Sequence, residues 1–470
     1  MATGTVQVVF PLLLVLSSLL AASSSGSDPE KTRCVMECRG TSERGAGREQ
    51  QREEAAEGGR TEHNPYYFGE RSYEHWSRSE HGRFKVLERF SRRSELLIGI
   101  ENYRLAIMEA EPETFIMPSH WDAEEIFYVM EGRGTITLLH EENRESHEIK
   151  RGDIMRIPAG VIVYAINKAE NERLRIAMLL HPISTPGHFE VHAQEFFGAA
   201  GSNPESFYSS FSKGVLEAAF NIRETLRAPE EGEIIKITEE QIGALSQTTG
   251  FGGDRPFAES NEPYNLLQKR PSHANEFGEL YEARSSDYHR LQDLDVDVSI
   301  ANISEIDDGT KLQLPGDQVG DGGGGRGHFE MVCPRRSGEA RGSEDATEPE
   351  GQQRVRYRTV RSQVSRGSVF VIPPGHPVTA VADANENLQV LCFGIRAGRN
   401  RKYYLAGKNN VMNELDREAK QLSFGAPAEE VQEVFDAQPE SVFLPGPGRR
   451  RGEAKRRQPS VESLFGFRGF

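Results

Sequence analysis

The chain has 470 residues, of which 36% are hydrophobic and 27% charged, and its formal net charge is −16. This length predicts two or three domains with sizeable cores. Because phosphate groups repel a strongly acidic chain, the composition excludes nucleic acid as the main partner.

The first 25 residues have the pattern of a secretory signal peptide. Val6–Leu20 is almost wholly apolar and is followed by Ala21-Ala22-Ser23, small residues typical of a cleavage site. The apolar run is too short for a membrane-spanning helix, and no later run approaches the roughly 20 apolar residues that such a helix needs. We therefore expect residues 1–25 to direct the chain into the secretory pathway and to be removed, leaving no membrane contact.

Residues 26–63 form a polar segment rich in charged residues, glycine and glutamine. Such a segment cannot bury enough apolar surface to offset the entropy of ordering, so we expect it to be disordered. It contains Cys34 and Cys38, which would face each other on one helical turn. A disulfide and an intermolecular thiol both fit these cysteines, and the sequence does not decide between them.

Residues 64–245 are predicted to form a first β domain with a helical extension. Short apolar runs alternate with Gly, Pro, Asn and Asp, a pattern typical of a sandwich or a barrel. After Asn203-Pro204, an N-cap pattern, apolar residues of Phe207–Ala219 recur at helical spacing. The predicted strands are Leu105–Met108, Ile126–Met130, Thr135–Leu139, Ile154–Ile157, Val161–Ile166 and Leu174–Leu180.

Residues 274–446 repeat this plan after a Pro- and Gly-rich linker at 246–273. Within the second domain, the polar stretch Arg335–Gln353 is predicted to be a surface loop. The basic residues 447–470 are predicted to be a disordered, solvated tail. The predicted strands are Val296–Ile303, His328–Val332, Ser368–Ile372, Thr379–Ala382 and Leu388–Ile395, and helical patterns follow at 411–422 and 431–435.

One short motif occurs once in each half of the chain. Gly152–Gly160 and Gly367–Gly375 share the pattern Gly-x5-Pro-x-Gly. The motif closes a turn before a strand in both halves, which indicates one barrel present in two copies.

Longer stretches around these motifs resemble the bicupin seed storage globulins of the 7S, or vicilin, type. The resemblance covers Asn64 to Gly448 and implies a mainly β fold of two tandem cupin (jelly-roll β-barrel) domains, each followed by a helical extension. It is carried by Pro118–Val129, Gly132–Gly134, Gly152–Asn167, Tyr288–Val296, Gly327–Pro334, Val371–Pro377, Leu405–Asn413 and Leu444–Pro447.

For function, the resemblance implies a seed storage protein, a nutrient reservoir with no enzymatic activity. It further implies a homotrimer in the protein storage vacuoles of seed, degraded by proteases at germination. Family members are frequently allergens and require no cofactor.

An enzyme is the disfavoured alternative. Catalytic cupins similar to germins, which are metal oxidases, hold one metal ion with three His and one Glu. His120 and Glu125 match part of this set, but Val163 stands where a further His is required, and Val378 stands at the same place in the second barrel. We expect no catalytic residue and a barrel mouth closed by hydrophobic side chains.

A copper or small-ligand carrier is a second alternative. Cys333, His376 and Cys392 lie around the second motif, and thiolate with imidazole suits copper or zinc. Tyr66 or Tyr67 would complete the site, as the resemblance to vicilins implies. The opposing interpretation is that the cysteines are small buried hydrophobes or form a disulfide.

Asn302-Ile303-Ser304 is an N-glycosylation sequon. The same residues belong to a predicted strand, and Asn302 would then point into a sheet and stay unmodified. The sequence leaves both outcomes open.

The second copy departs from the first in Thr310–Gly325. Leu105 and Gly134 are separated by the same number of residues as Val298 and Gly327, yet this part of the second copy ends in four glycines where a core strand is expected. One hypothesis is a compensated frameshift: codons for these residues, read one base later, can give Pro-Asn-Tyr-Asn-Tyr-Pro-Gly-Thr-Lys, one undetermined residue, and Ala-Met-Val-Val-Glu. The other is a genuine glycine-rich loop in place of a strand.

Overall fold

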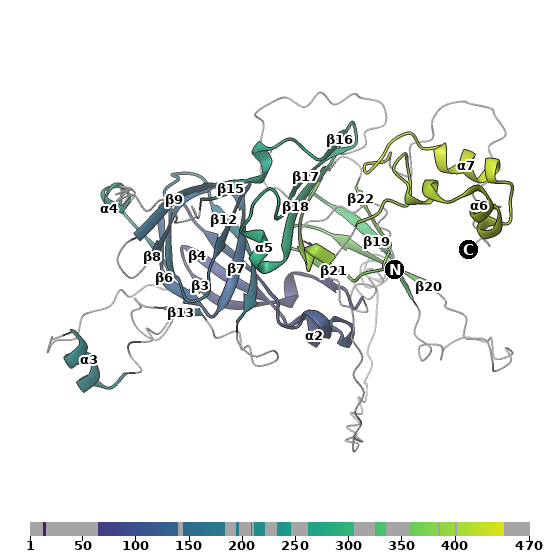
Figure 1. Cartoon of the computed structure of the whole chain (residues 1–470). Coiled ribbons are helices and arrows are strands. Elements are labelled where there is room, and N and C mark those ends of the chain that lie inside the picture. Colours follow the sequence, from purple (N-terminus) through teal and green to yellow (C-terminus); the bar gives the residue numbers. More distant parts are fainter. Residues whose placement is uncertain are drawn as a thin grey trace, which may run out of the picture.

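The computed structural model describes residues 13–15, 64–139, 144–183, 194–196, 208, 211–220, 233–245, 262–304, 325–334, 357–383, 386–399 and 402–445. Two β barrels lie side by side (Figure 1). The predicted plan of two barrels, each followed by helices, is confirmed.

Barrel 1 consists of two facing sheets. A seven-stranded sheet has the order β15-β10-β7-β12-β5-β4-β3, and a second sheet has the order β13-β6-β11-β8-β9, with β14 also paired to β6. Side chains from both sheets, among them Phe127, Met178 and Ile136, fill the interior. The strands are β3 (Tyr73–Ser79), β4 (Gly82–Leu87), β5 (Arg104–Ala110), β6 (Thr114–Trp121), β7 (Ala123–Glu131), β8 (Arg133–Leu139), β9 (Arg144–Lys150), β10 (Asp153–Ile157), β11 (Ile162–Asn167), β12 (Leu174–Pro182), β13 (Gln194–Phe196), β14 (Ile234–Lys236) and β15 (Tyr264–Asn265).

Barrel 2 repeats the larger sheet with the order β16-β17-β18-β23-β1-β21-β2. Its second sheet has three strands among the described residues, in the order β20-β19-β22. Strand β1 comes from the predicted signal peptide. The strands are β1 (Leu13–Val15), β2 (Tyr67–Phe68), β16 (His273–Asn275), β17 (Gly278–Ala283), β18 (Val296–Ile303), β19 (Gly327–Pro334), β20 (Tyr357–Val364), β21 (Val369–Ile372), β22 (Val378–Ala382) and β23 (Leu388–Ile395).

The two barrels exchange edge strands. Strand β2, which precedes barrel 1 in the chain, pairs antiparallel with β21 of barrel 2. Strand β15, which lies in the predicted linker and precedes barrel 2, pairs antiparallel with β10 of barrel 1. Each barrel therefore has an outer strand supplied by the segment that leads into the other barrel.

A continuous apolar core joins the barrels. Tyr128 and Leu179 of barrel 1 belong to the same buried cluster as Val298 and Phe393 of barrel 2. Neighbouring residues on β7 point to opposite faces of the sheet, so Phe127 fills the interior of barrel 1 while Tyr128 packs toward barrel 2. Strands β5, β7 and β12 of the larger barrel 1 sheet are therefore buried on both faces, which explains why their sequences are almost unbroken apolar runs.

Helices follow each barrel, as predicted. Val215 lies in α3, whereas the predicted N-cap at Asn203 lies outside the described residues. The pattern at 411–422 divides into a 3₁₀ turn and a helix, α6, which ends at Gly425 with φ +63°. Among the described residues, no helix has the length and apolar character needed to cross a membrane. The helices are η1 (Glu70–Ser72), α2 (Phe90–Arg93), η2 (Glu95–Ile100), α3 (Lys213–Phe220), α4 (Glu239–Leu245), η5 (Leu266–Gln268), α5 (Leu291–Leu294), η6 (Ala397–Arg399), η7 (Val411–Glu414), α6 (Arg417–Phe424) and α7 (Ala428–Asp436).

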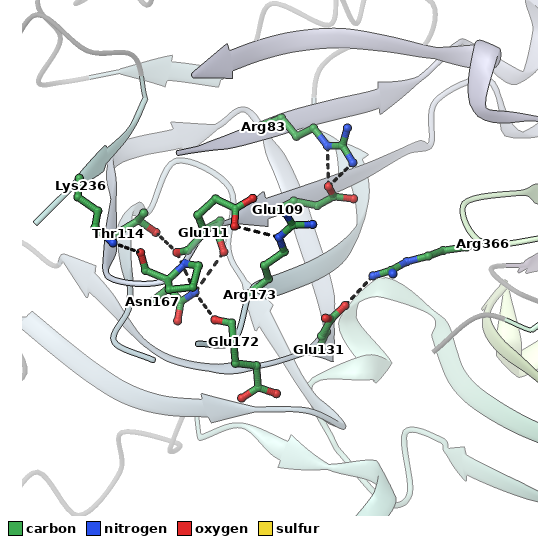
Figure 2. Close-up of polar contacts among 12 residues, drawn as sticks. Arg83, Glu109, Glu111, Thr114, Glu131, Asn167, Glu172, Arg173, Lys236 and Arg366 are labelled. Carbon is green, nitrogen blue, oxygen red and sulfur yellow. Dashed lines mark hydrogen bonds and ion pairs between the residues drawn. The ribbon is translucent and has the colours of Figure 1, made fainter. Parts of the chain in front are cut away.

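A buried amide connects three segments at one end of barrel 1. The Asn167 side chain donates hydrogen bonds to the backbone carbonyls of Ala110, Glu111 and Glu172 at 2.9–3.1 Å, and its oxygen accepts one from the backbone of Ala169 (Figure 2). One polar side chain thus connects the ends of β5 and β11 with the loop before β12.

Candidate functional site

The interior of barrel 1 is where a cupin metal site would lie. Glu125 on β7 and Val163 on β11 line one cavity of about 50 Å³ there. Glu125 is the only carboxyl group among the lining residues, and no His, Cys, Lys or Arg joins it in the lining. The other walls are Phe84, Met108, Ile116, Ser119, Trp121, Phe127, Ile136, Ile157, Tyr164, Ala165, Ile176 and Met178.

Glu125 is poorly suited to hold a cation. Its side chain is buried in this apolar cavity, and burial raises the pKa of the carboxyl to about 8. The group is therefore protonated near neutral pH, whereas a metal ligand must be an ionised carboxylate.

His120 does not join Glu125. Side chains alternate along β6, and Ser119 and Trp121 line the cavity while His120 is not among its lining residues. His120 instead lies opposite Glu195 of β13. Of the three barrel 1 residues compared with the ligands of catalytic cupins, the structure brings Glu125 and Val163 together and leaves His120 outside the cavity. The alternation of side chains along β6 is the sequence signal that predicts the place of His120.

The interior of barrel 2 is also apolar at the corresponding place. Val378 is buried on β22, opposite Met331 of β19. Beside them the rings of Phe329 and Phe370 stack with a centroid separation of 4.0 Å. A valine at this position packs into a filled core.

The two predicted thiol ligands face different surroundings. Cys392 on β23 hydrogen-bonds with Ser299, and the positive charge of Lys402 acts on its thiol. The charge that acts on the thiol of Cys333 on β19 is that of Arg358. Both thiols are free, and burial raises their pKa values, to about 11 for Cys333 and about 12 for Cys392. Each thiol therefore stays protonated at neutral pH unless a metal displaces the proton.

The third predicted ligand, His376, packs on Tyr66. Their ring centroids lie 5.7 Å apart in an edge-on arrangement, and His376 Nδ1 lies 3.1 Å from the carbonyl oxygen of Pro374. The Tyr67 hydroxyl is 3.1 Å from Ser368 Oγ. Within the described part of the chain, no three His, Cys, Asp or Glu side chains come together as a metal site. The copper site stays a prediction. Of its two candidate tyrosines, which the sequence does not distinguish, Tyr66 has the ring contact with His376.

A larger cavity that the sequence did not predict lies on barrel 2. Its volume is about 730 Å³, and its charged lining comes from segments far apart in the chain, with His273, Arg284 and Lys402 facing Glu282, Asp295 and Asp297. Lys402 Nζ lies 3.6 Å from Asp297 Oδ2 and 3.7 Å from Glu282 Oε1. Arg284 Nη2 also lies 3.2 Å from Glu282 Oε2, so these four charged side chains largely balance one another.

The sequon residue Asn302 lies on β18 between β17 and β23. Its Oδ1 accepts a hydrogen bond of 2.7 Å from Gln389 Nε2. The strand prediction for these residues is confirmed, and glycosylation stays a prediction.

Comparisons with known proteins agree on one family. The family model described as Cupin matches residues 105–225 and 323–432. The vicilin Jug r 6.0101 of Juglans regia is 45% identical over 442 residues, which are 88% of this chain and 84% of that protein. The vicilin Cor a 11.0101 of Corylus avellana is 43% identical over 467 residues, 91% of this chain and 98% of that protein. A crystal structure of vicilin from Corylus avellana superposes with a TM-score of 0.68 at 42% identity, covering 82% of this chain and all of that one.

Proposed function

Because this chain belongs to the vicilin family of two-domain cupin proteins, we propose that it is a nutrient reservoir that assembles as a homotrimer in the protein storage vacuoles of seed. Vicilins are non-catalytic storage proteins and generally need no cofactor. The observation that carries the proposal is the 45% identity to a walnut vicilin over 88% of the chain.

The barrel interiors support a storage role from the physical side. Glu125 is the single carboxyl group in the lining of the barrel 1 cavity, and valines stand where metal-binding cupins need histidine. A storage protein needs dense packing and solubility during mobilisation, and it needs no reactive pocket. The acidic balance of the chain favours solubility at neutral pH.

Assembly and mobilisation are tested together on protein from seed. Native mass spectrometry of vacuolar protein is expected to give three times the mass of the processed chain, and this species is expected to disappear during germination. A monomer at vacuolar concentration, or a level that stays constant through seedling growth, would contradict the proposal. Purified protein assayed with oxalate and added manganese is the matched test of the germin-like alternative, and turnover there would restore the enzyme hypothesis.

We further propose that the protein is an allergen. The relatives Jug r 6.0101 and Cor a 11.0101 have allergen names and are 45% and 43% identical to this chain. IgE from sera of patients sensitised to walnut or hazelnut vicilin is expected to bind the folded protein, and binding is expected to fall when either nut vicilin is added as competitor. Sera that recognise both nut vicilins and ignore this protein would contradict the proposal.

A further inference from the structure

The larger sheets of the two barrels differ at one strand. In barrel 1, β7 lies between β10 and β12 and is antiparallel to both. The corresponding place in barrel 2, between β21 and β23, is filled by β1, which is parallel to both neighbours. Here β1 supplies 3 residues where β7 supplies 9. Barrel 2 therefore has a place for a long strand that only a short segment occupies.

The pairing register shows that this is the same place in both barrels. Met155 and Phe370 each stand third after the first glycine of the repeated motif, and they pair with Phe127 and Leu13 respectively. On the other side, Phe127 pairs with Met178 and Leu13 pairs with Cys392. The three residues of β1 thus lie on the positions that Phe127, Ile126 and Glu125 take in barrel 1, with the chain direction reversed.

The signal peptide is a poor permanent occupant of this place. Once it is removed, β21 and β23 each lose their partner on that side, although Phe370, Val371 and Phe393 are fully buried. Unpaired backbone N–H and C=O groups in a core cost free energy comparable to lost hydrogen bonds, and an open strand edge invites aggregation. A stable second barrel therefore requires a strand from another source.

The chain between β18 and β19 has the right position to supply it. A Cβ on Gly132 would clash with the carbonyl oxygen of Arg173, and one on Gly325 would clash with that of Asn387, which occupies the matching place beside β23. Gly132, which follows β7 in barrel 1, thus has an equivalent in barrel 2, Gly325. When the two copies are aligned on these glycines, positions 316–324 correspond in sequence to Ala123–Glu131, the residues of β7.

The sequence as it stands cannot fill that position. Between Gly316 and Gly324, Val319 is the single aliphatic residue, and five of the nine residues are glycine. Glycine provides no core side chain and weakens strand interiors. Since core strands are rich in β-branched and aromatic residues, this segment lacks the side chains that a strand between β21 and β23 needs.

We infer that the space between β21 and β23 is a strand-accepting site for the chain's own positions 316–324, translated in a reading frame shifted by one base. Read in that frame, positions 320–324 can encode Ala-Met-Val-Val-Glu, and Gly325-Arg326-Gly327 follows. The resulting Val-Val-Glu-Gly-Arg-Gly matches Val129-Met130-Glu131-Gly132-Arg133-Gly134 of barrel 1 in position and type. Codons of this kind would encode an apolar strand and keep the length of the chain.

Peptide mass spectrometry of protein purified from seed tests this inference. The shifted frame places a lysine at position 318, so trypsin is expected to release a peptide that covers positions 319–326 and contains Ala-Met-Val-Val-Glu. Detection of the peptide Leu312–Arg326, with its run of four consecutive glycines, would overturn the inference. Recovery of Leu13–Val15 in the mature protein would overturn it too, because the signal peptide would then be the natural occupant.

A binding experiment tests the site itself. The chain beginning at Gly26, with the sequence as it stands, is mixed with a synthetic peptide of the shifted positions 316–326 or with a scrambled peptide of the same composition. The matching peptide is expected to bind, to slow proteolysis within β21 and β23, and to raise the unfolding temperature by several degrees, while the scrambled peptide has none of these effects. Equal protease resistance of the chain with and without the matching peptide would show that no strand is missing.

Discussion

Arg366 and Glu131 connect the two barrels, with 2.6 Å between Arg366 Nη2 and Glu131 Oε2 (Figure 2). Glu131 ends β7, and Arg366 lies in the turn before β21. The side chains are 48% and 29% exposed, and ion pairs in contact with water contribute little to stability. The apolar exchange of strands is therefore the stronger connection.

The first prediction compares these two connections. Arg366→Ala is expected to lower the free energy of unfolding by less than about 1 kcal/mol. Leu266→Ala, which removes a fully buried side chain next to β15, is expected to cost about 2–5 kcal/mol because a cavity is left in the shared core. Urea unfolding of both variants checks this. An ion-pair variant that is the less stable of the two would show that charge holds the barrels together.

The second prediction concerns pH and Glu125. Its pKa in the folded protein is about 8, above the value of about 4.3 expected in the unfolded chain, so the folded state retains a proton that the unfolded state loses. Stability is therefore expected to fall as pH rises from about 4 to about 8. Glu125→Gln removes this penalty and is expected to be more stable than the native protein at pH 8, by an amount on the order of a few kcal/mol.

Urea unfolding between pH 5 and pH 8.5 measures both proteins. Glu80→Gln, the same change at an exposed position between β3 and β4, is the matched control. If the stability of the native protein and of Glu125→Gln changed with pH in parallel, a raised pKa of Glu125 would be excluded.

The third prediction concerns Asn167. Asn167 is fully buried, and Asn167→Ala removes the hydrogen bonds that its amide donates to the backbone carbonyls of Ala110, Glu111 and Glu172. The Glu111 carbonyl keeps the hydrogen bond that it accepts from Thr114. A buried group that loses its partner costs about 1–3 kcal/mol, so this variant is expected to lose at least that much stability. Thermal unfolding checks it, with the exposed Asn171→Ala as the control, expected to change stability by less than about 0.5 kcal/mol. Equal unfolding temperatures for the two variants would deny Asn167 a structural role.

The fourth prediction concerns proteolysis. The polar stretches 26–63 and Arg335–Gln353 contain few residues that can be buried, so trypsin is expected to cut there first. Mass spectrometry of the earliest fragments identifies the sites. First cuts inside Arg83–Leu180 would show that the division of the chain into domains is wrong.

The sequence predicts most of the core strands, but it misses the core strand β6 and strands of two other kinds. Runs such as Leu174–Leu180 are apolar because both faces of this part of the larger barrel 1 sheet are buried, and composition alone identifies them as strands. Strand β9 is largely polar and becomes a strand through its pairing with β8. Strands β2 and β15 have 2 residues each and exist only because the other barrel provides an edge.

Site prediction had the same limits. Residue type at a fixed spacing identified Glu125 and Val163, which do share a cavity. The direction of His120 depends on the alternation of β6, which was not recognised as a strand. The charged cavity around Lys402 joins segments that are far apart in sequence, and no local pattern indicates it.

The exchange of β2 and β15 also bears on the origin of the chain. Strand β2 leads into barrel 1 and pairs with β21 of barrel 2, and strand β15 leads into barrel 2 and pairs with β10 of barrel 1. Because β21 and β10 are equivalent strands, the two contacts are related as in a two-fold symmetric dimer. A single-barrel ancestor that swapped its N-terminal arms between two copies would leave this arrangement once its gene was duplicated and fused. Either half, produced alone, would again expose an unpaired strand edge and is expected to dimerise through it.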